Sequence, residues 1–146
     1  MTATPNELLI IGAGLSGLMT ALTVAQADRA QGRAPRPITL LDKGRSVGGR
    51  LATRRIGAGR ADHGAQFFTV RDEQFKRHVN GWQAAGLVFP WATGWSNGSG
   101  DDSPTDGYPR YAVAQGMNNL AKQLAAALAE FDTVQIMVNV RVEAVG

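Results

Sequence analysis

Three glycines near the N-terminus have the spacing of a phosphate-binding loop. Gly12, Gly14 and Gly17 lie in the stretch GAGLSG, directly after the apolar run ELLII. The first glycine permits a tight turn out of a strand, the second lets backbone approach a pyrophosphate, and the third lets a following helix pack closely. The start of that helix offers free N–H groups to the phosphates, and the Ser16 hydroxyl could add a donor. Because a strand-like run precedes the glycines and a helix-like run follows, a dinucleotide site is favoured over glycines that only turn a corner.

An acid, Asp42, ends the second apolar run, PITLLD. A carboxylate at the end of a second parallel strand can accept hydrogen bonds from a ribose diol, and it opposes a 2′-phosphate. The alternative is a surface acid that pairs with Lys43 or Arg45. The linker DRAQGRAPRP, which precedes this run, is long for such a unit and is expected to be a surface loop. The ribose interpretation is favoured because the acid follows an otherwise apolar strand.

Periodicity predicts the elements that position these residues. Apolar residues recur at helical spacing after Gly14, so strand, turn, helix and strand form one βαβ unit with parallel strands. Thr69 and Asp72 have capping-box spacing for a second helix. The chain is predicted to be an α/β protein with helices over 15–27, 69–86 and 116–130, an extended edge segment over 87–95, a loop over 96–109, and two final strands over 133–145 that bend near Asn139.

Composition narrows the classes of function. The 146 residues include no cysteine, which excludes disulfides, thiolate metal sites and cysteine nucleophiles. No apolar run approaches the ~20 residues of a membrane helix, and the N-terminus lacks the pattern of a signal peptide. Residues 29–60 hold nine Lys or Arg residues against the single acid Asp42. This basic run is either an ordinary solvated surface or a field that attracts a phosphate-bearing cofactor. A nucleic-acid patch is the weakest interpretation, because no nucleic-acid-binding module is recognisable. We expect a soluble, cytoplasmic protein that binds neither membrane nor nucleic acid.

Four motifs give the chain a resemblance to a known family. They are GAGLSGL, LLDKGRSVGGRLATRR, ADHGAQFFT and YPRYAVAQGMNNLAKQLA. Together they resemble the renalase-like branch of the flavin-containing amine oxidase superfamily, over residues 7–145. The GGR motif is typical of FAD-binding relatives, and DHGAQFFT points to the renalase-like branch.

The resemblance implies that FAD is the cofactor and indicates which residues hold it. The glycine loop would cradle the pyrophosphate, Asp42 the adenosine ribose, and Arg50 would supply positive charge. The segment from His63 would pass the isoalloxazine ring, and Val142 in the last strand would meet the adenine. The full cofactor set is Gly12, Ala13, Gly14, Leu15, Ser16, Gly17, Asp42, Lys43, Gly49, Arg50, His63, Gly64, Ala65 and Val142.

Substrate contacts are expected from the residues that follow. The resemblance implies Gln66, Phe67 and Phe68, and because strand geometry sends neighbouring side chains to opposite faces, at most one of the two phenylalanines should touch substrate. Trp91 could wall a pocket or cover apolar surface. No catalytic nucleophile or metal ligand is predicted, since a flavin carries the reactivity itself.

The implied reaction is oxidation of wrongly reduced dihydronicotinamide dinucleotides by O2, giving H2O2. Two alternatives stay open from the sequence: an amine oxidase of the same superfamily, and a dinucleotide-binding module without catalysis. A yellow preparation that bleaches under substrate without oxygen would favour an enzyme.

The implied domain organisation is discontinuous. Residues 1–66 and 131–146 would form a Rossmann-like FAD-binding domain with a parallel sheet, and residues 67–130 part of an inserted α+β substrate domain. Family members continue beyond the equivalent of Gly146, so the resemblance predicts that this chain is an N-terminal portion. It also predicts exposed apolar surface, which would favour self-association.

Overall fold

The structure, a computed structural model, describes residues 7–94 and 105–144. The chain divides into two compact units. The first unit comprises residues Met1–Leu51 and Leu120–Gly146, and the second unit Ala52–Asn119. The domain boundaries inferred from sequence remain a prediction.

The first unit is built on a parallel sheet of three strands. Strands β1 (Leu8–Ile11), β2 (Ile38–Leu41) and β7 (Val134–Met137) lie in the order β1-β2-β7. Helix α1 (Leu15–Ala30) connects β1 to β2, and helix α3 (Asn118–Leu128) precedes β7. Both neighbouring pairs of strands are parallel, which confirms the predicted βαβ unit.

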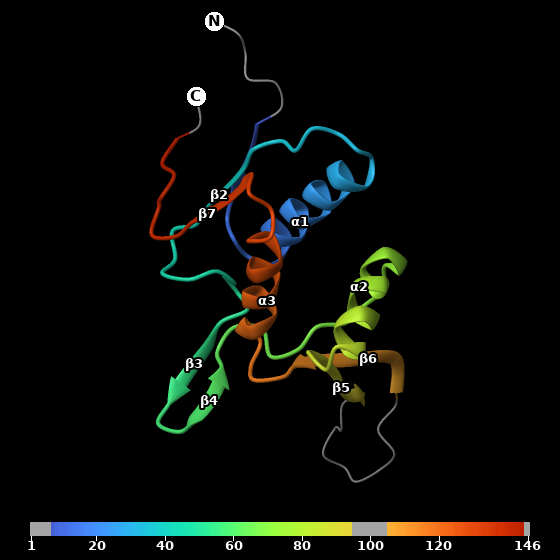
Figure 1. Ribbon diagram of the computed structural model, residues 1–146. Coiled ribbons are helices and arrows are strands. Elements are labelled where there is room, and N and C mark those ends of the chain that lie inside the picture. The colour runs from blue at the N-terminus through green and yellow to red at the C-terminus, as the bar shows by residue number, and fades with distance from the viewer. Residues whose placement is uncertain (1–6, 95–104, 145–146) are drawn as a thin grey trace, which may run out of the picture. The chain divides into compact units, whose positions relative to one another are not determined.

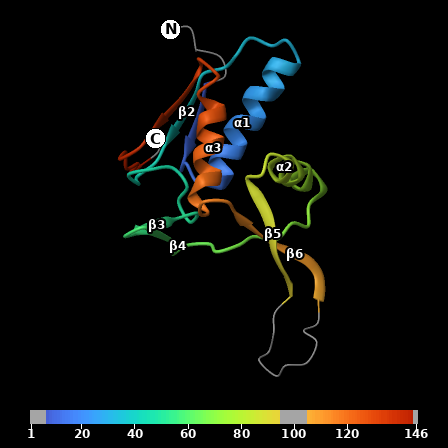
Figure 2. The same ribbon diagram turned by 60° about the horizontal axis from the view of Figure 1, so that its bottom comes forward.

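One face of this sheet is covered by helices. α1 and α3 lie side by side on the same face (Figures 1 and 2). Side chains alternate between faces along a strand, and on β2 the buried positions are Ile38 and Leu40. The two helices share this face because parallel connections are right-handed. The buried helix residues are Leu18, Ala21, Leu22 and Ala25 of α1, and Leu120, Ala121, Leu124 and Leu128 of α3.

The other face of the sheet exposes apolar side chains. Leu9, Ile11 and Met137 are large hydrophobic residues that remain exposed. Ile11 pairs with Leu41, and Leu41 pairs with Met137, so these three side chains form one row across the sheet. The predicted exposed apolar surface is therefore present, and self-association through it stays a prediction.

The second unit consists of two antiparallel hairpins and a helix. Strands β3 (Thr53–Ile56) and β4 (Gly59–Asp62) form the first hairpin. Strands β5 (Val88–Gly94) and β6 (Thr105–Val113) pair in the second, and α2 (Glu73–Ala84) lies between the hairpins in sequence. Among the described residues, no helix of either unit is long and apolar enough to cross a membrane.

Helix α2 starts later than the capping-box spacing predicts. Its N-cap is Asp72, whose carboxylate accepts a hydrogen bond from the Phe75 amide at 2.7 Å. Thr69 therefore lies outside the helix. The acid takes the N-cap position itself because its backbone is extended, with φ −82° and ψ 132°, and its short side chain reaches the first-turn amides.

The prediction of a loop over 96–109 is wrong at its C-terminal end, because β6 already begins at Thr105. Its polar, glycine-rich composition suggested a loop, but pairing with β5 determines the backbone there. The ladder shifts between the pairs Ala92–Arg110 and Gly94–Thr105, and the extra β6 residues include Gly107 with φ +74°. Residues 96–104 of the predicted loop lie outside the described part.

The predicted final strand, and with it the strand position of Val142, is also wrong. β7 ends at Met137, and Asn139 adopts φ +59°, which is the expected bend. After the bend, the Asn139 amide donates to the Gly44 carbonyl at 2.8 Å and the Val140 amide to the Asp42 carbonyl at 2.9 Å. The chain is held by this turn rather than by a neighbouring strand, so it forms no second strand there.

A buried carboxylate holds the linker between α1 and β2. Asp28, in the last turns of α1, is 1% exposed and forms ion pairs with Arg33 and Arg36, each at 2.7 Å. The hydrogen bond from Arg36, aided by Arg33 and opposed by burial, lowers the pKa of Asp28 from 3.8 to about 2. The long linker is thus pinned to the helix it follows.

This ion-pair cluster predicts an acid-dependent part of the stability. Because the folded-state pKa lies below 3.8, the stabilisation is present above pH 4 and is lost as the pH falls toward 2. We expect the free energy of unfolding of Asp28→Asn to fall less steeply than that of the wild type between pH 4 and 2. Urea unfolding at each pH measures this slope, and equal slopes for the two proteins would contradict the assignment.

The close packing of α1 on β1 predicts opposite outcomes for two glycine substitutions. A Cβ on Gly17 would lie 2.0 Å from the Gly12 carbonyl oxygen, whereas a Cβ on Gly81 in α2 would meet nothing within 4 Å. Gly17→Ala should lower the free energy of unfolding by about 3 kcal/mol or more, since backbone must move. Gly81→Ala should raise it by about 0.5–1 kcal/mol, because alanine favours helix. Denaturant unfolding of both variants tests the pair, and a neutral Gly17→Ala would refute the clash.

Candidate dinucleotide site and neighbouring pocket

The glycine loop turns sharply at the end of β1. Gly12 adopts φ +105°, a conformation that side chains rarely tolerate, and its amide donates to the Leu41 carbonyl at 2.7 Å. A Cβ on Gly12 would meet no atom within 4 Å. The loop is therefore fixed to the sheet on one side and leaves room on the other.

The backbone amides in the first turn of α1 receive no side-chain cap from the protein. Gly14 is the N-cap and brings no side-chain cap, and the first bond within the helix runs from the Leu18 amide to the Gly14 carbonyl at 3.0 Å. The first-turn amides of a helix have no acceptor within it, and they carry the positive end of the helix dipole. Ser16 is exposed in this turn. An uncapped helix start beside open space fits a diphosphate.

The second glycine motif packs against the first. The Gly48 amide donates to the Ala13 carbonyl at 2.8 Å, and Gly14 and Gly48 form a parallel backbone bridge. Gly48 and Gly49 have φ values of +117° and +52°, and a Cβ on Gly49 would lie 3.6 Å from the Gly14 Cα. The structure thus brings together two motifs that lie more than thirty residues apart in sequence.

Asp42 joins the end of β2 to the glycine loop. Its Oδ2 accepts a hydrogen bond from the Ala13 amide at 2.6 Å, and its Oδ1 accepts one from the Gly44 amide at 2.7 Å. The Ala13 amide is therefore used within the protein. A carboxylate offers about four acceptor positions, so Asp42 keeps capacity for a ribose hydroxyl. The side chain has a structural role in addition to the predicted nucleotide role.

Three further residues of the predicted cofactor set lie around this loop or follow β7. Lys43 and Arg50 are exposed, at the two ends of the turn that carries Gly48 and Gly49. Val142 is half-buried and follows the Asn139 bend, whose backbone bonds to the Asp42–Gly44 turn. Their contacts with a cofactor stay predictions.

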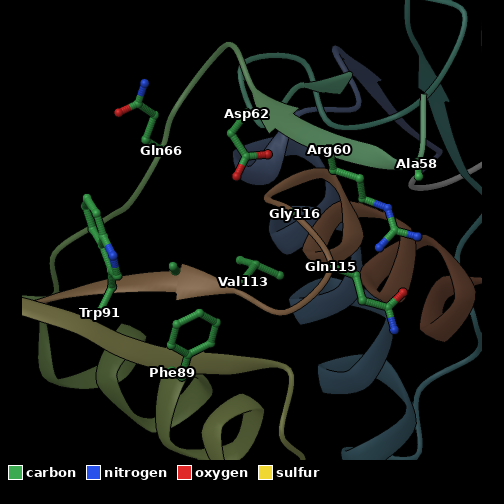
Figure 3. A pocket seen from close by; sticks show the side chains of 10 residues that line it. Ala58, Arg60, Asp62, Gln66, Phe89, Trp91, Val113, Gln115 and Gly116 are labelled. Carbon is green, nitrogen blue, oxygen red and sulfur yellow. The ribbon is translucent and has the colours of Figure 1, made fainter. Parts of the chain in front are cut away.

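The residues predicted to lie along the flavin ring or to contact substrate belong to the second unit. The amides of His63 and Gly64 both donate to the Ala52 carbonyl, at 3.1 and 3.4 Å, so the chain leaves β4 in a fixed bend before Ala65. Gln66 and Trp91 line a cavity of about 530 Å³. Figure 3 shows Gln66 and Trp91 on one side of this pocket and Arg60 on the other.

The two predicted substrate phenylalanines separate, although neither lies in one of the strands. Phe67 lies beside Trp91, with ring centroids 6.2 Å apart. Phe68 packs instead against Tyr111 and Phe75, at 5.7 and 5.9 Å, and its backbone bridges to Tyr111. Phe68 therefore has a packing role, and Phe67 is the phenylalanine next to a pocket-lining residue.

Several pocket residues were missed by sequence reasoning. They are Ala58, Arg60, Asp62, Phe89, Ala112, Val113, Gln115 and Gly116. Arg60 and Asp62 are two residues apart, so in a strand their side chains lie on the same face, and this spacing could have indicated a shared polar site. The contributions of β5 and of the turn after β6 were not detectable, because they depend on how the hairpins pack.

Strand, glycine turn, uncapped helix and parallel second strand together define a dinucleotide-binding Rossmann-like domain. The family model described as NAD(P)-binding Rossmann-like domain matches residues 10–82, which is 73 of the 146 residues. The chain belongs to this family, and the predicted α/β fold with a parallel sheet is confirmed.

Solved structures share the fold at low sequence identity. A tetrameric form of 2-methyl-3-hydroxypyridine-5-carboxylic acid oxygenase matches with TM-score 0.54 and 19% identity, over 94% of this chain and 32% of its own. The p-nitrophenol 4-monooxygenase PnpA from Pseudomonas putida DLL-E4 matches with TM-score 0.54 and 14% identity, over 92% and 32%. The PF1083 protein from Pyrococcus furiosus matches with TM-score 0.51 and 12% identity, over 92% and 51%.

The chain therefore spans about a third of the length of the two oxygenases and about half of the third protein. The family match shows the NAD(P)-binding Rossmann-like domain, and these neighbours share its fold. Membership of the flavin oxidoreductase superfamily and FAD as the cofactor stay predictions. The renalase-like branch is a finer assignment that goes beyond them.

The two hydrogen bonds that the Asp42 carboxylate accepts predict a loss of stability when this side chain is removed. Asp42→Ala removes two charge-assisted hydrogen bonds and leaves the Ala13 amide without its acceptor, so the free energy of unfolding should fall by about 2–4 kcal/mol. Lys43→Ala, at the exposed neighbouring position, should change it by less than about 0.5 kcal/mol. Urea unfolding at pH 7 measures both, and equal effects would show that Asp42 is not the link.

Proposed function

We propose that this chain is the cofactor-binding part of an FAD-dependent oxidoreductase. The observation that carries the proposal is the contact between Gly14 and Gly48, which sets two glycine motifs side by side at the start of α1. Side chains are missing there on both segments, so one extended diphosphate could lie against both backbones. The family of the chain and its oxygenase neighbours support the same conclusion.

The residues of the first unit fit the nucleotide part of FAD. The uncapped amides of Ser16 and Gly17 would hold the diphosphate, and the remaining acceptor positions of Asp42 would hold the ribose. Arg50 would add positive charge from the GGR turn. When bound, the flavin supplies the redox chemistry, and the protein supplies binding and orientation.

The proposed reaction is oxidation of dihydronicotinamide dinucleotide isomers, with O2 as the oxidant and H2O2 as the product. The resemblance of DHGAQFFT and GGR to the renalase-like branch supports this substrate. The second unit contributes the pocket that Gln66 and Trp91 line, with Phe67 beside it. An amine oxidase and a non-catalytic module are the alternative outcomes.

Gly14→Ala separates cofactor binding from folding. A Cβ on Gly14 would meet only the Gly48 carbonyl oxygen, at an ordinary distance of 4.0 Å, so the variant should fold. The methyl group would nevertheless stand where the diphosphate approaches the backbone. We expect wild-type protein to bind FAD, seen as a yellow colour and quenched flavin fluorescence, and Gly14→Ala to bind it at least about tenfold more weakly. Circular dichroism and unfolding curves verify that the variant is folded.

Gly81→Ala serves as the matched control. Its glycine lies in the second unit and in open space, so this variant should leave FAD affinity unchanged. Equal FAD affinity in wild type and Gly14→Ala would overturn the loop assignment, and NAD binding without FAD would favour a non-catalytic module.

A separate experiment tests the substrate. The yellow colour of the FAD-loaded protein should bleach without oxygen on adding the dihydronicotinamide isomers. Bleaching by an amine alone would favour an amine oxidase.

A further inference from the structure

The pocket of the second unit has one cationic wall and one aromatic wall. Arg60 reaches into it from β4, and Phe89 and Trp91 line it from β5 (Figure 3). These two aromatic side chains are 45% and 53% exposed, which is unusual for residues of their size. A cavity of about 530 Å³ is within the range of small-molecule sites.

The acid in the pocket, Asp62, is hydrogen-bonded to the hairpin and to the backbone at the start of α3 rather than to this arginine. Oδ1 of Asp62 accepts hydrogen bonds from the Thr53 hydroxyl and, at 2.9 Å, from the Met117 amide. The Thr53 oxygen in turn accepts one from the Asn118 amide at 3.0 Å. Asp62 thus ties the β3–β4 hairpin to the backbone where α3 begins, and the structure shows no ion pair between it and Arg60 within the described residues.

A second cation lies directly beside Arg60. In the antiparallel register of the hairpin, Arg55 is the partner of Arg60, so both side chains leave the same face. Like charges directly opposite each other are destabilising. Within residues 7–94 and 105–144, no hydrogen bond or ion pair is shown for either guanidinium. An anion bound here would relieve this repulsion.

The arginine wall is held in place by close packing. Gly116, which lines the pocket, has φ +99°, and a Cβ on it would lie 2.6 Å from the Thr53 side chain. The turn after β6 therefore presses against the base of the hairpin. Together with the Asp62 bonds, this contact fixes β4 relative to the β6 residues that form the pocket floor, Ala112 and Val113.

We propose that Arg60 makes this pocket selective for planar molecules that carry an anionic group, a carboxylate or a phosphate. The ring would lie against Phe89 and Trp91, and the anion would pair with Arg60, whose planar fork suits both oxyanions. A cationic amine would be repelled by Arg60 and Arg55. The proposal rests on the proposed function only in taking this pocket as the substrate site, and it disfavours an amine substrate.

Direct binding tests this selectivity without the cofactor. The probes are benzoate, phenyl phosphate, benzylamine and inorganic phosphate, titrated into the 146-residue chain and followed by calorimetry and by the Trp91 indole signal in NMR, assigned with Trp91→Phe. Benzoate or phenyl phosphate should bind and shift this signal, and benzylamine should not. The stronger of the two anions identifies whether the site favours a carboxylate or a phosphate.

Arg60→Gln and Arg54→Gln form the matched pair of variants. Arg54 is in the same hairpin, but its register partner is Ala61, so it leaves the opposite face. Arg60→Gln should weaken binding of the planar anion about tenfold, whereas Arg54→Gln, with the same loss of charge, should leave it within about twofold. Because both positions are exposed, both variants should fold.

Three outcomes would overturn the proposal. These are equal losses in the two variants, binding of inorganic phosphate as tight as that of phenyl phosphate, and preferential binding of benzylamine. None of them depends on FAD, so a chain that fails to bind FAD yet discriminates the probes would refute the proposed function alone. A chain that binds FAD and does not discriminate would refute this inference alone.

Discussion

The first unit depends on the close approach of α1 to the end of β1. At Gly17, any side chain would have to occupy space already filled by the Gly12 carbonyl and, 3.2 Å away, by the Ile10 side chain. This contact aims the start of the helix at the turn, and it lets Leu18, Ala21 and Leu22 bury their side chains beside the sheet. The proposed anion binding at the helix start and the packing of the core therefore depend on the same missing Cβ.

Asp42 combines a structural role with its predicted nucleotide role. The Asp42 carboxylate accepts hydrogen bonds from a backbone amide of the glycine loop and from one of its own turn. The Asp42 backbone carbonyl accepts a third, from the Val140 amide. Three segments that are distant in sequence thereby meet at the carboxyl end of the sheet. In an open parallel sheet this edge is where ligands bind, since strand ends and helix starts converge there.

The second unit uses a carboxylate in a comparable way. Asp62 satisfies the backbone at the start of α3 and the Thr53 hydroxyl, and within the described residues it forms no ion pair with Arg60. The aromatic cluster of Phe68, Phe75 and Tyr111 packs separately, so Phe68 contributes to stability and not to the pocket.

The amino-acid sequence alone determined the strand–turn–helix–strand unit and predicted its phosphate-binding character, because glycine spacing and apolar periodicity are local properties. It also indicated two residues that line the pocket: Gln66, through the DHGAQFFT motif, and Trp91, as an aromatic side chain that could form a pocket wall. It was wrong about Thr105–Pro109 and the strand around Val142, since pairing partners and a positive φ at Asn139 override local composition. Only the tertiary structure decided that Gly48 meets Gly14 and that Arg60 shares a pocket with Phe89 and Trp91. These contacts join segments far apart in the chain, and they follow from packing that no single segment encodes.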